Sequence, residues 1–268
     1  MKVYIIVDAE GITGIVNHEM QVKPDSPKYD EMRELYMSDL NAAIEGSFES
    51  GAKEVIVYDM HYYGHNVLLH ELHPGAKVVI GKPPKIGPPA RIDEDFQALI
   101  MIGFHSMSET KGGLLNHTYT LDMKALHLNG RLMGEIGLEA AMAGTKGVPL
   151  VMISGDDKAM DEAEALLECF EGACVKYGLG ESSALCLPPS QTRSLIKEKV
   201  ISALRSLSDY KPLLIDLPYT IDIEFYEESS ALKASGIEGI KRKDARTVEM
   251  KGDDLIFLWE DFLSRYST

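Results

Sequence analysis

Four short apolar runs constrain the fold of this chain more than any other feature of its sequence. They occupy residues 3–8, 54–58, 98–102 and 149–153. Their interiors are continuously apolar, which is typical of strands buried on both faces of a parallel sheet. Between them lie segments with apolar residues at helical spacing, at about 29–50 and 135–143. The sequence therefore predicts an α/β protein whose mainly parallel sheet is covered by helices on both faces.

The pattern changes in the last third of the chain. The predicted elements there are a helix over 191–207, a strand near 213–216, an alternating strand over 220–226 and an amphipathic helix over 253–266. They indicate a smaller α+β part, so we divide the chain into an α/β domain of residues 1–190 and a C-terminal lobe of residues 191–268. No internal repeat or long linker fixes this boundary, and one continuous domain is the alternative.

The charge balance excludes several classes of partner. Acidic residues outnumber basic ones by 42 to 27, the formal net charge is −15, and no basic tract is longer than residues 241–243. Because the general attraction to phosphate groups is missing, nucleic acid and anionic membranes are not expected partners. No apolar window approaches the roughly 18 to 20 residues of a membrane span.

The cysteines predict a reducing environment. Cys169, Cys174 and Cys186 are odd in number and none is at Cys-x-x-Cys spacing. A chain of 268 residues with 45% hydrophobic residues can bury a large core without disulfides. We therefore expect a cytoplasmic protein whose cysteines are buried apolar residues rather than metal ligands.

Each of the four predicted strands leads into residues that could bind a metal ion. These residues are Asp8 and Glu10, Asp59 and His61, His105, and Asp156 with Asp157. In open α/β sheets, ligands bind outside the carboxyl ends of the strands, so these side chains are expected to converge there. Asp8 and Glu10 are two residues apart on an extended segment and can share a side, so both can reach one ion or one can bridge two.

Two further residues join this set by their position. His117 follows the Gly112-Gly113 loop, and Glu135 stands at the start of a predicted helix. Mixed imidazole and carboxylate ligands suit Zn²⁺ or a related metal, whereas Mg²⁺ alone would not need the histidines. Two such ions joined by a carboxylate would generate a hydroxide near neutral pH and polarise a carbonyl group. The pattern therefore predicts a hydrolase.

Taken one at a time, these residues have simpler explanations. Asp8 could cap a helix, His61 could be a structural histidine, and Asp156-Asp157 suits a capping turn as well as a ligand pair. The coincidence of such residues at equivalent strand ends favours the metal site. The remaining histidines are predicted to be surface residues: His18, His65, His70, His73 and His127.

With these motifs, the sequence resembles the D-aminopeptidase family of dinuclear zinc peptidases, of the dipeptide-transport-operon type. The segments that carry the resemblance are, in order, residues 7–14, 58–61, 102–105, 116–118, 134–138 and 155–157. The resemblance runs to about residue 190 and is weaker beyond it. It implies two zinc ions per chain, with Asp8 bridging them, Glu10 and His61 on one ion, and His105 and Glu135 on the other.

The same resemblance implies an activity and an assembly. The expected reaction is zinc-dependent removal of the N-terminal residue, a D-residue, from short peptides or amino-acid amides by attack of a metal-bound hydroxide. His117 would be the catalytic histidine, which stabilises the oxyanion or gives a proton to the leaving amine. Family members form large ring-like homo-oligomers, and a decamer is the expected size.

Two other functions stay open at this point. The stretches 8–13 and 155–161 resemble motifs of haloacid-dehalogenase-type phosphatases, in which Asp8 would be the nucleophile and Mg²⁺ the metal. That interpretation leaves His61, His105 and Glu135 without a role. The second alternative is a non-catalytic protein that binds a metal or a metabolite for regulation. Structural zinc sites, however, are usually closed by four ligands that often include cysteine.

Overall fold

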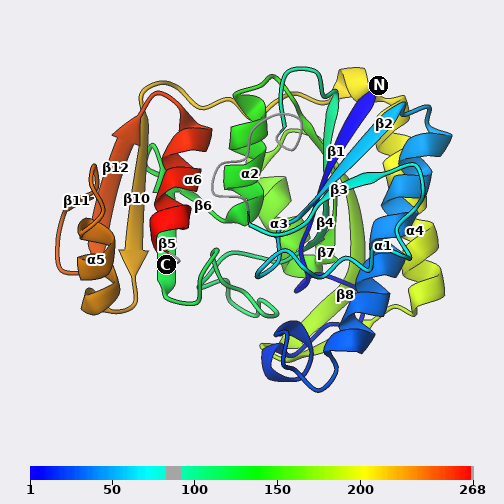
Figure 1. Cartoon of the computed structure of the whole chain (residues 1–268), viewed down its shortest axis with the longest axis horizontal. Coiled ribbons are helices and arrows are strands. Elements are labelled where there is room, and N and C mark those ends of the chain that lie inside the picture. The colour runs from blue at the N-terminus through cyan, green and yellow to red at the C-terminus, as the bar shows by residue number, and fades with distance from the viewer. Residues whose placement is uncertain (83–91, 267–268) are drawn as a thin grey trace.

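The computed structural model describes residues 1–82 and 92–266 and is organised around a seven-stranded sheet (Figure 1). In spatial order its strands are β3 (Lys77–Val79), β2 (Glu54–Asp59), β1 (Lys2–Val7), β4 (Ala98–Phe104), β7 (Leu150–Asp156), β8 (Glu171–Gly180) and β9 (Ser183–Cys186). All neighbouring pairs are parallel except β8 and β9. The four predicted strands are therefore confirmed as parallel neighbours, and so is the α/β class.

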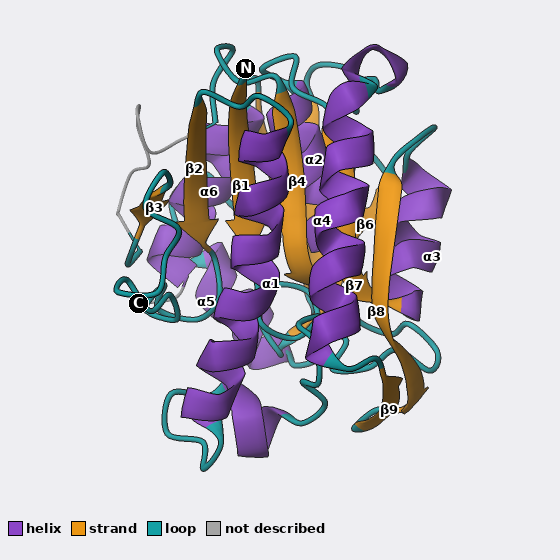
Figure 2. Ribbon diagram, turned by 90° about the vertical axis from the view of Figure 1, so that its right-hand side faces the viewer, coloured by secondary structure: helices purple, strands orange, loops and turns teal. Residues whose placement is uncertain are grey.

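Helices cover both faces of this sheet, as the continuously apolar strands predict. Successive residues of a strand point to opposite faces. Val3, Ile5 and Val7 accordingly pack in the core under α1 (Tyr29–Glu49) and α4 (Pro189–Arg205), which lie side by side in Figure 2. Tyr4 and Ile6 pack in a second core, on the face covered by α2 (Glu135–Gly144) and α3 (Asp157–Leu166).

A smaller antiparallel sheet forms the other side of the molecule. Its strands, in spatial order, are β11 (Lys241–Arg242), β12 (Thr247–Gly252), β10 (Tyr219–Phe225), β5 (Met123–Leu128) and β6 (Arg131–Met133). Helices α5 (Glu228–Ser235) and α6 (Leu255–Tyr266) belong to this side, and α6 lies between the small sheet and α2 (Figure 1). A third core, which includes Trp259 of α6 and Leu138 of α2, joins the small sheet to α2, and α2 in turn covers the large sheet.

The boundary at residue 190 stays a prediction. Strands from before it join the small sheet, and the helix that begins beside it packs on the large sheet. β5 and β6 come from the middle of the chain, yet β5 pairs with β10 and β6 pairs with β5, whereas α4 follows residue 188 and packs against α1 and β8. The strand expected near 213–216 is wrong, because this segment is irregular. Pro212 and Pro218 bracket it, and a proline cannot donate a backbone hydrogen bond to a neighbouring strand.

The cysteines are free, as expected, but their predicted burial is wrong. Cys169 is exposed in the connection between α3 and β8, and Cys174 and Cys186 are half-buried on the strands at the end of the sheet. Among the described residues, no helix is both long and apolar enough to cross a membrane.

Candidate metal centre

The carboxyl ends of β1, β2 and β4 lie level with one another. Val7, the last residue of β1, pairs with both Asp59 and Ile102. The next residue, Asp8, donates its backbone N–H to the Ile102 carbonyl at 2.8 Å, which fixes the start of its loop. The register of the parallel strands therefore brings Asp8, His61 and His105 to one edge of the sheet, as the sequence predicts.

Asp8 lies at the centre of the resulting cluster. One oxygen, Oδ1, is 3.0 Å from Nδ1 of His61, and the other, Oδ2, is 3.4 Å from Nε2 of His105. Glu10 joins the first side, with Oε2 3.2 Å from Nδ1 of His61. Glu135, at the start of α2, joins the second, with Oε1 3.4 Å from Nε2 of His105. The cluster thus has two halves that share the carboxylate of Asp8.

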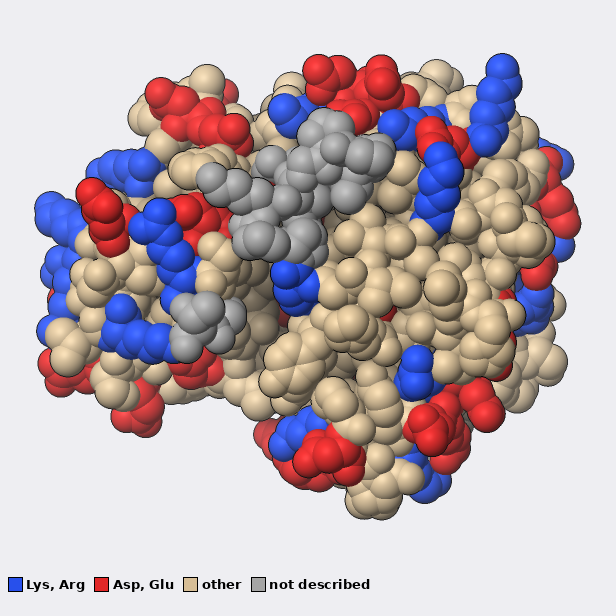
Figure 3. All heavy atoms as spheres, in the orientation of Figure 1, with Lys and Arg blue, Asp and Glu red and all other residues tan. Residues whose placement is uncertain are grey.

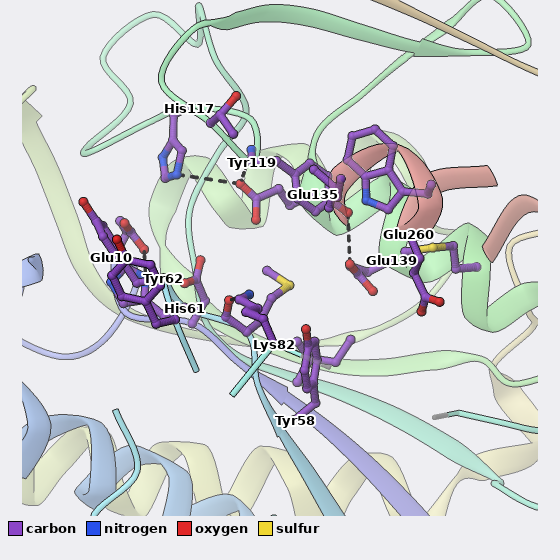
Figure 4. A pocket seen from close by; sticks show the side chains of 18 of the residues that line it. Glu10, Tyr58, His61, Tyr62, Lys82, His117, Tyr119, Glu135, Glu139 and Glu260 are labelled. Carbon is purple, nitrogen blue, oxygen red and sulfur yellow. Dashed lines mark hydrogen bonds and ion pairs between the residues drawn. The ribbon is translucent and has the colours of Figure 1, made fainter. Parts of the chain in front are cut away.

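His117 stands at the edge of the second half. Its ring stacks on that of His105, with centroids 4.2 Å apart and planes inclined by 10°. Its Nδ1 is 3.0 Å from the Leu115 carbonyl, and its Nε2 is 3.9 Å from Oε1 of Glu135 (Figure 4). The His117 side chain is 14% exposed and that of His105 only 1%, so His117 is the more accessible of the two.

The prediction that His18 is a surface residue is wrong. Nδ1 of His18 lies 3.9 Å from Oε1 of Glu10, and its ring centroid is 5.7 Å from that of His117. A short π-helix, His18–Val22, carries it there, and Asn17 caps this helix by accepting a hydrogen bond from the Met20 backbone N–H. This short irregular segment has no hydrophobic periodicity from which its position could be read.

The other four histidines lie outside the cluster, and their exposure differs. His65 and His70 are exposed, as predicted. His73 is half-buried and stacks on Phe48, with centroids 5.1 Å apart, and His127 is half-buried on β5.

Asp59 and the Asp156-Asp157 pair are held by structural hydrogen bonds. The carboxylate of Asp59 accepts from the backbone N–H groups of Asn66 and Val67 at 2.7 and 3.0 Å. Asp156 caps α3 by accepting from the Ala159 N–H at 2.7 Å, and Asp157 accepts from the Gly178 N–H at 2.7 Å. The capping alternative therefore describes Asp156, whereas Asp157 binds the neighbouring strand β8.

The donor set of the cluster fits one or more transition-metal ions. Three groups of side chains bring their ligand atoms within 4.8 Å of one another: Asp8, Glu10 and His61; His105, His117 and Glu135; and Glu10, His18 and His117. Oε2 of Glu10 and Nε2 of His105 are buried and form no hydrogen bond with any residue in 1–82 or 92–266. Buried polar atoms without a partner are costly, and a cation would satisfy both.

Contacts behind the histidines orient their rings. Nε2 of His61 is 3.2 Å from the Val22 carbonyl, and Nδ1 of His105 is 2.9 Å from the Ser106 carbonyl. In each ring, the other nitrogen faces the carboxylates. Backbone carbonyls commonly fix metal-binding histidines in this way, with one nitrogen held and the other free to bind the ion.

The electrostatics of the cluster favour a cation. Burial opposes charge on these groups, yet His105 and His61 hold the pKa of the Asp8 carboxyl well below its usual range. Burial also works to lower the pKa of both imidazoles, but Glu10, Glu135 and Asp8 outweigh it and raise each pKa well above the ordinary value. Protons and a metal ion therefore compete for the same nitrogen atoms.

Comparison with known proteins identifies the family. A family model described as D-aminopeptidase matches residues 1–263, which is nearly the whole chain. The chain belongs to the D-aminopeptidase family. It is therefore a peptidase, and the phosphatase and non-catalytic alternatives are set aside.

A sequence match and a structural match agree with the family assignment. The D-aminopeptidase of Bacillus subtilis (strain 168) is 31% identical over 264 residues, which span 98% of this chain and 96% of that protein. The solved structure of the Zn-dependent D-aminopeptidase DppA from Bacillus subtilis, described as a self-compartmentalizing protease, matches with a TM-score of 0.91 and 30% identity. The match covers 98% of this chain and 95% of that one.

In this member of the D-aminopeptidase family, a pocket of about 750 Å³ opens beside the cluster. Its lining includes the predicted residues Asp8, Glu10, His61, His117 and Glu135, together with His18. The rest of the lining is largely apolar and includes Leu99 of β4, Met142 of α2 and Trp259 of α6. The face in Figure 3 is hollowed between the small-sheet side and the large-sheet side, both of which contribute lining residues.

The wall of the pocket also carries an acidic group four residues beyond Glu135. Glu139 accepts a hydrogen bond from the Tyr119 hydroxyl at 3.0 Å, and the Tyr119 backbone N–H donates to Glu135 at 2.7 Å (Figure 4). Burial, with help from Glu135 and Glu260, raises the pKa of Glu139 to about 8. Tyr119 thus links Glu139, in the wall of the pocket, to Glu135 of the cluster.

Proposed function

We propose that this peptidase holds two zinc ions and removes the N-terminal residue, a D-residue, from short peptides or amino-acid amides. The observation that carries the proposal is the position of Asp8, whose two carboxylate oxygens face different histidines at 3.0 and 3.4 Å. A carboxylate placed in this way can bridge two ions, and each half of the cluster then supplies one imidazole and one further carboxylate. The zinc dependence of DppA supports the choice of metal.

In this proposal, Asp8 would be shared by the two ions, Glu10 and His61 would hold one, and His105 and Glu135 would hold the other. Mixed imidazole and carboxylate coordination that leaves positions open is typical of catalytic zinc. When bound, the ions would act as Lewis acids that polarise the scissile carbonyl and lower the pKa of an attacking water. The carboxylates and imidazoles of the chain set where that carbonyl lies.

His117 would act on the substrate directly. The Leu115 carbonyl holds its Nδ1, so that Nε2 is available at the edge of the pocket. From there, Nε2 can hydrogen-bond the oxyanion that develops on the carbonyl, or pass a proton to the leaving amine. The stack on His105 fixes the plane of the His117 ring, which pre-organises either role.

The stereochemistry, assembly and location are proposed from the relatives and the sequence. The similarity to Bacillus subtilis D-aminopeptidase, at 31% identity in the sequence comparison and 30% in the structural one, supports a preference for D-residues. The description of DppA as self-compartmentalizing supports a ring-like homo-oligomer, with a decamer as the expected size. Light scattering on the purified protein measures that size. The sequence favours a cytoplasmic protein, with neither nucleic acid nor membrane as a partner.

The test is one assay run in parallel on D- and L-aminoacyl amides and on short peptides, with zinc removed by a chelator and then restored. We expect cleavage of the D-substrates that stops on chelation and returns with zinc but not with Mg²⁺. Metal analysis should find about two zinc ions per chain, as a dinuclear hydrolytic centre requires. Full activity in the chelator would refute the metal-dependent mechanism, and a preference for L-substrates would refute the stereochemical part.

A further inference from the structure

A buried lysine donates hydrogen bonds to the loop that carries Glu10. Lys176 lies on β8 with its side chain fully buried. Its Nζ donates to the backbone carbonyls of Glu10, Ile12 and Ile15, at 2.5, 2.8 and 2.5 Å. A lysine ammonium has three N–H donors, so all of them are used on one stretch of six residues.

This contact reaches across the sheet. The loop leaves β1, whereas Lys176 stands on β8, which is separated from β1 by β4 and β7. On the way, Gly11 donates its N–H to the Gly103 carbonyl of β4 at 2.7 Å. The segment from Glu10 to Ile15 therefore runs over the carboxyl ends of the neighbouring strands, and Lys176 holds it from the far side.

A carboxylate holds the same loop from another element. Asp39, fully buried on α1, accepts from the backbone N–H of Thr13 at 2.9 Å and from its hydroxyl at 2.9 Å. The carbonyls of the loop thus face a cation and one of its N–H groups faces an anion. Buried charges are expensive, and they are retained where they have well-aligned partners of this kind.

We propose that Lys176 and Asp39 are positioning residues that fix the backbone from Glu10 to Ile15 and thereby set the affinity of the centre for zinc. The positively charged ammonium of Lys176 holds three backbone carbonyls close together by donating a hydrogen bond to each. Neither side chain lines the pocket, so both act on the metal centre through the loop. This inference rests on the proposed function, because it assumes that Glu10 is a zinc ligand.

Three substitutions test the inference in the full-length protein. Lys176→Met keeps the length of the side chain but removes its charge and its donors. Thr13→Val removes only the hydroxyl that donates a hydrogen bond to Asp39. The control is Lys199→Met, which removes a lysine that pairs at 2.8 Å with Glu171, the first residue of β8. Zinc affinity is measured by competition with a chromogenic chelator, and the melting temperature is measured without and with zinc.

We expect zinc affinity to fall in both loop variants and to stay at the wild-type value in Lys199→Met. Loss of an interaction that orients a metal ligand typically weakens binding roughly 10- to 100-fold. Lys176→Met should lie near the upper end of this range and Thr13→Val near the lower end. The rise in melting temperature on adding zinc should shrink in the same order.

A purely structural role has a different signature. If both variants melt earlier without zinc but bind zinc like the wild type, Lys176 and Asp39 only stabilise the fold and the inference is wrong. If Lys176→Met does not fold, Thr13→Val decides, because its shape is nearly unchanged. If the wild-type protein binds no zinc, the proposed function is refuted. If the wild type binds zinc and both variants bind it with the same affinity, only this inference is refuted.

Discussion

The ring of His117 stacks on the ring of His105, with centroids 4.2 Å apart and planes inclined by only 10°. The two imidazoles have different surroundings. His105 is enclosed by the carboxylates of Asp8 and Glu135, whereas Nε2 of His117 stands at the edge of the pocket. The stack therefore pairs a residue suited to hold a metal ion with one suited to act on the substrate.

Replacing His117 should separate catalysis from metal binding. In His117→Ala we expect kcat to fall by about 10²- to 10⁴-fold, the usual loss when a general acid is removed, with zinc content unchanged. The measurements are steady-state kinetics and metal analysis of the same sample. His105→Ala is the matched comparison and should lose zinc as well. Wild-type turnover in His117→Ala, or loss of its zinc, would contradict the role proposed for this residue.

Replacing the shared carboxylate should affect both halves of the centre. Asp8→Ala removes both oxygens that face His61 and His105, so we expect activity and both zinc ions to be lost together. Glu10→Ala removes a group from one half only and should retain about one ion, because Glu135 and His105 are untouched. Metal content per chain distinguishes these results. Retention of both ions in Asp8→Ala would exclude a bridging role.

A single added methyl group at Gly11 should disturb the loop. A Cβ atom there would lie 1.9 Å from the Phe104 carbonyl oxygen, which belongs to the backbone of β4. We expect Gly11→Ala to lower the free energy of unfolding by about 3 kcal/mol and to weaken zinc binding. In Gly252→Ala, the control, the nearest atom would be 3.6 Å away on Leu258. Equal denaturation midpoints for the two variants would show that the loop can move aside.

The pKa of Glu139 predicts a pH dependence of stability. Burial raises this pKa from 4.5 to about 8 in the folded protein. Between these values the folded state binds more protons than the unfolded state, so this group makes the protein less stable as the pH rises. Glu139→Gln removes this effect and keeps an acceptor for the Tyr119 hydroxyl.

We therefore expect the melting temperature of metal-free Glu139→Gln to exceed that of the wild type by an amount that grows from pH 5 to pH 8. Glu238→Gln, on an exposed turn near the end of α5, is the control. A difference between Glu139→Gln and the wild type that stays constant over this range would contradict the predicted shift.

The part of the centre that depends on strand register could be predicted from the sequence. Parallel strands end at one edge, so the residues after Val7, Asp59 and Phe104 had to meet. His18 escaped prediction because its position depends on a short π-helix, and Lys176 because its contacts are with distant backbone. The strands Met123–Leu128 and Arg131–Met133 were missed, since half-buried polar residues and short length weaken their pattern.

The pairing of the β5–β6 hairpin with β10, through β5, bears on the order in which the molecule is built. During translation, these two strands leave the ribosome long before β10. Until β10 follows, β5 is paired with β6 alone. Trp259 of α6, which lines the pocket, emerges later than β10. A chain that stops short of α6 therefore carries the carboxylates and imidazoles of the centre without this wall of the pocket.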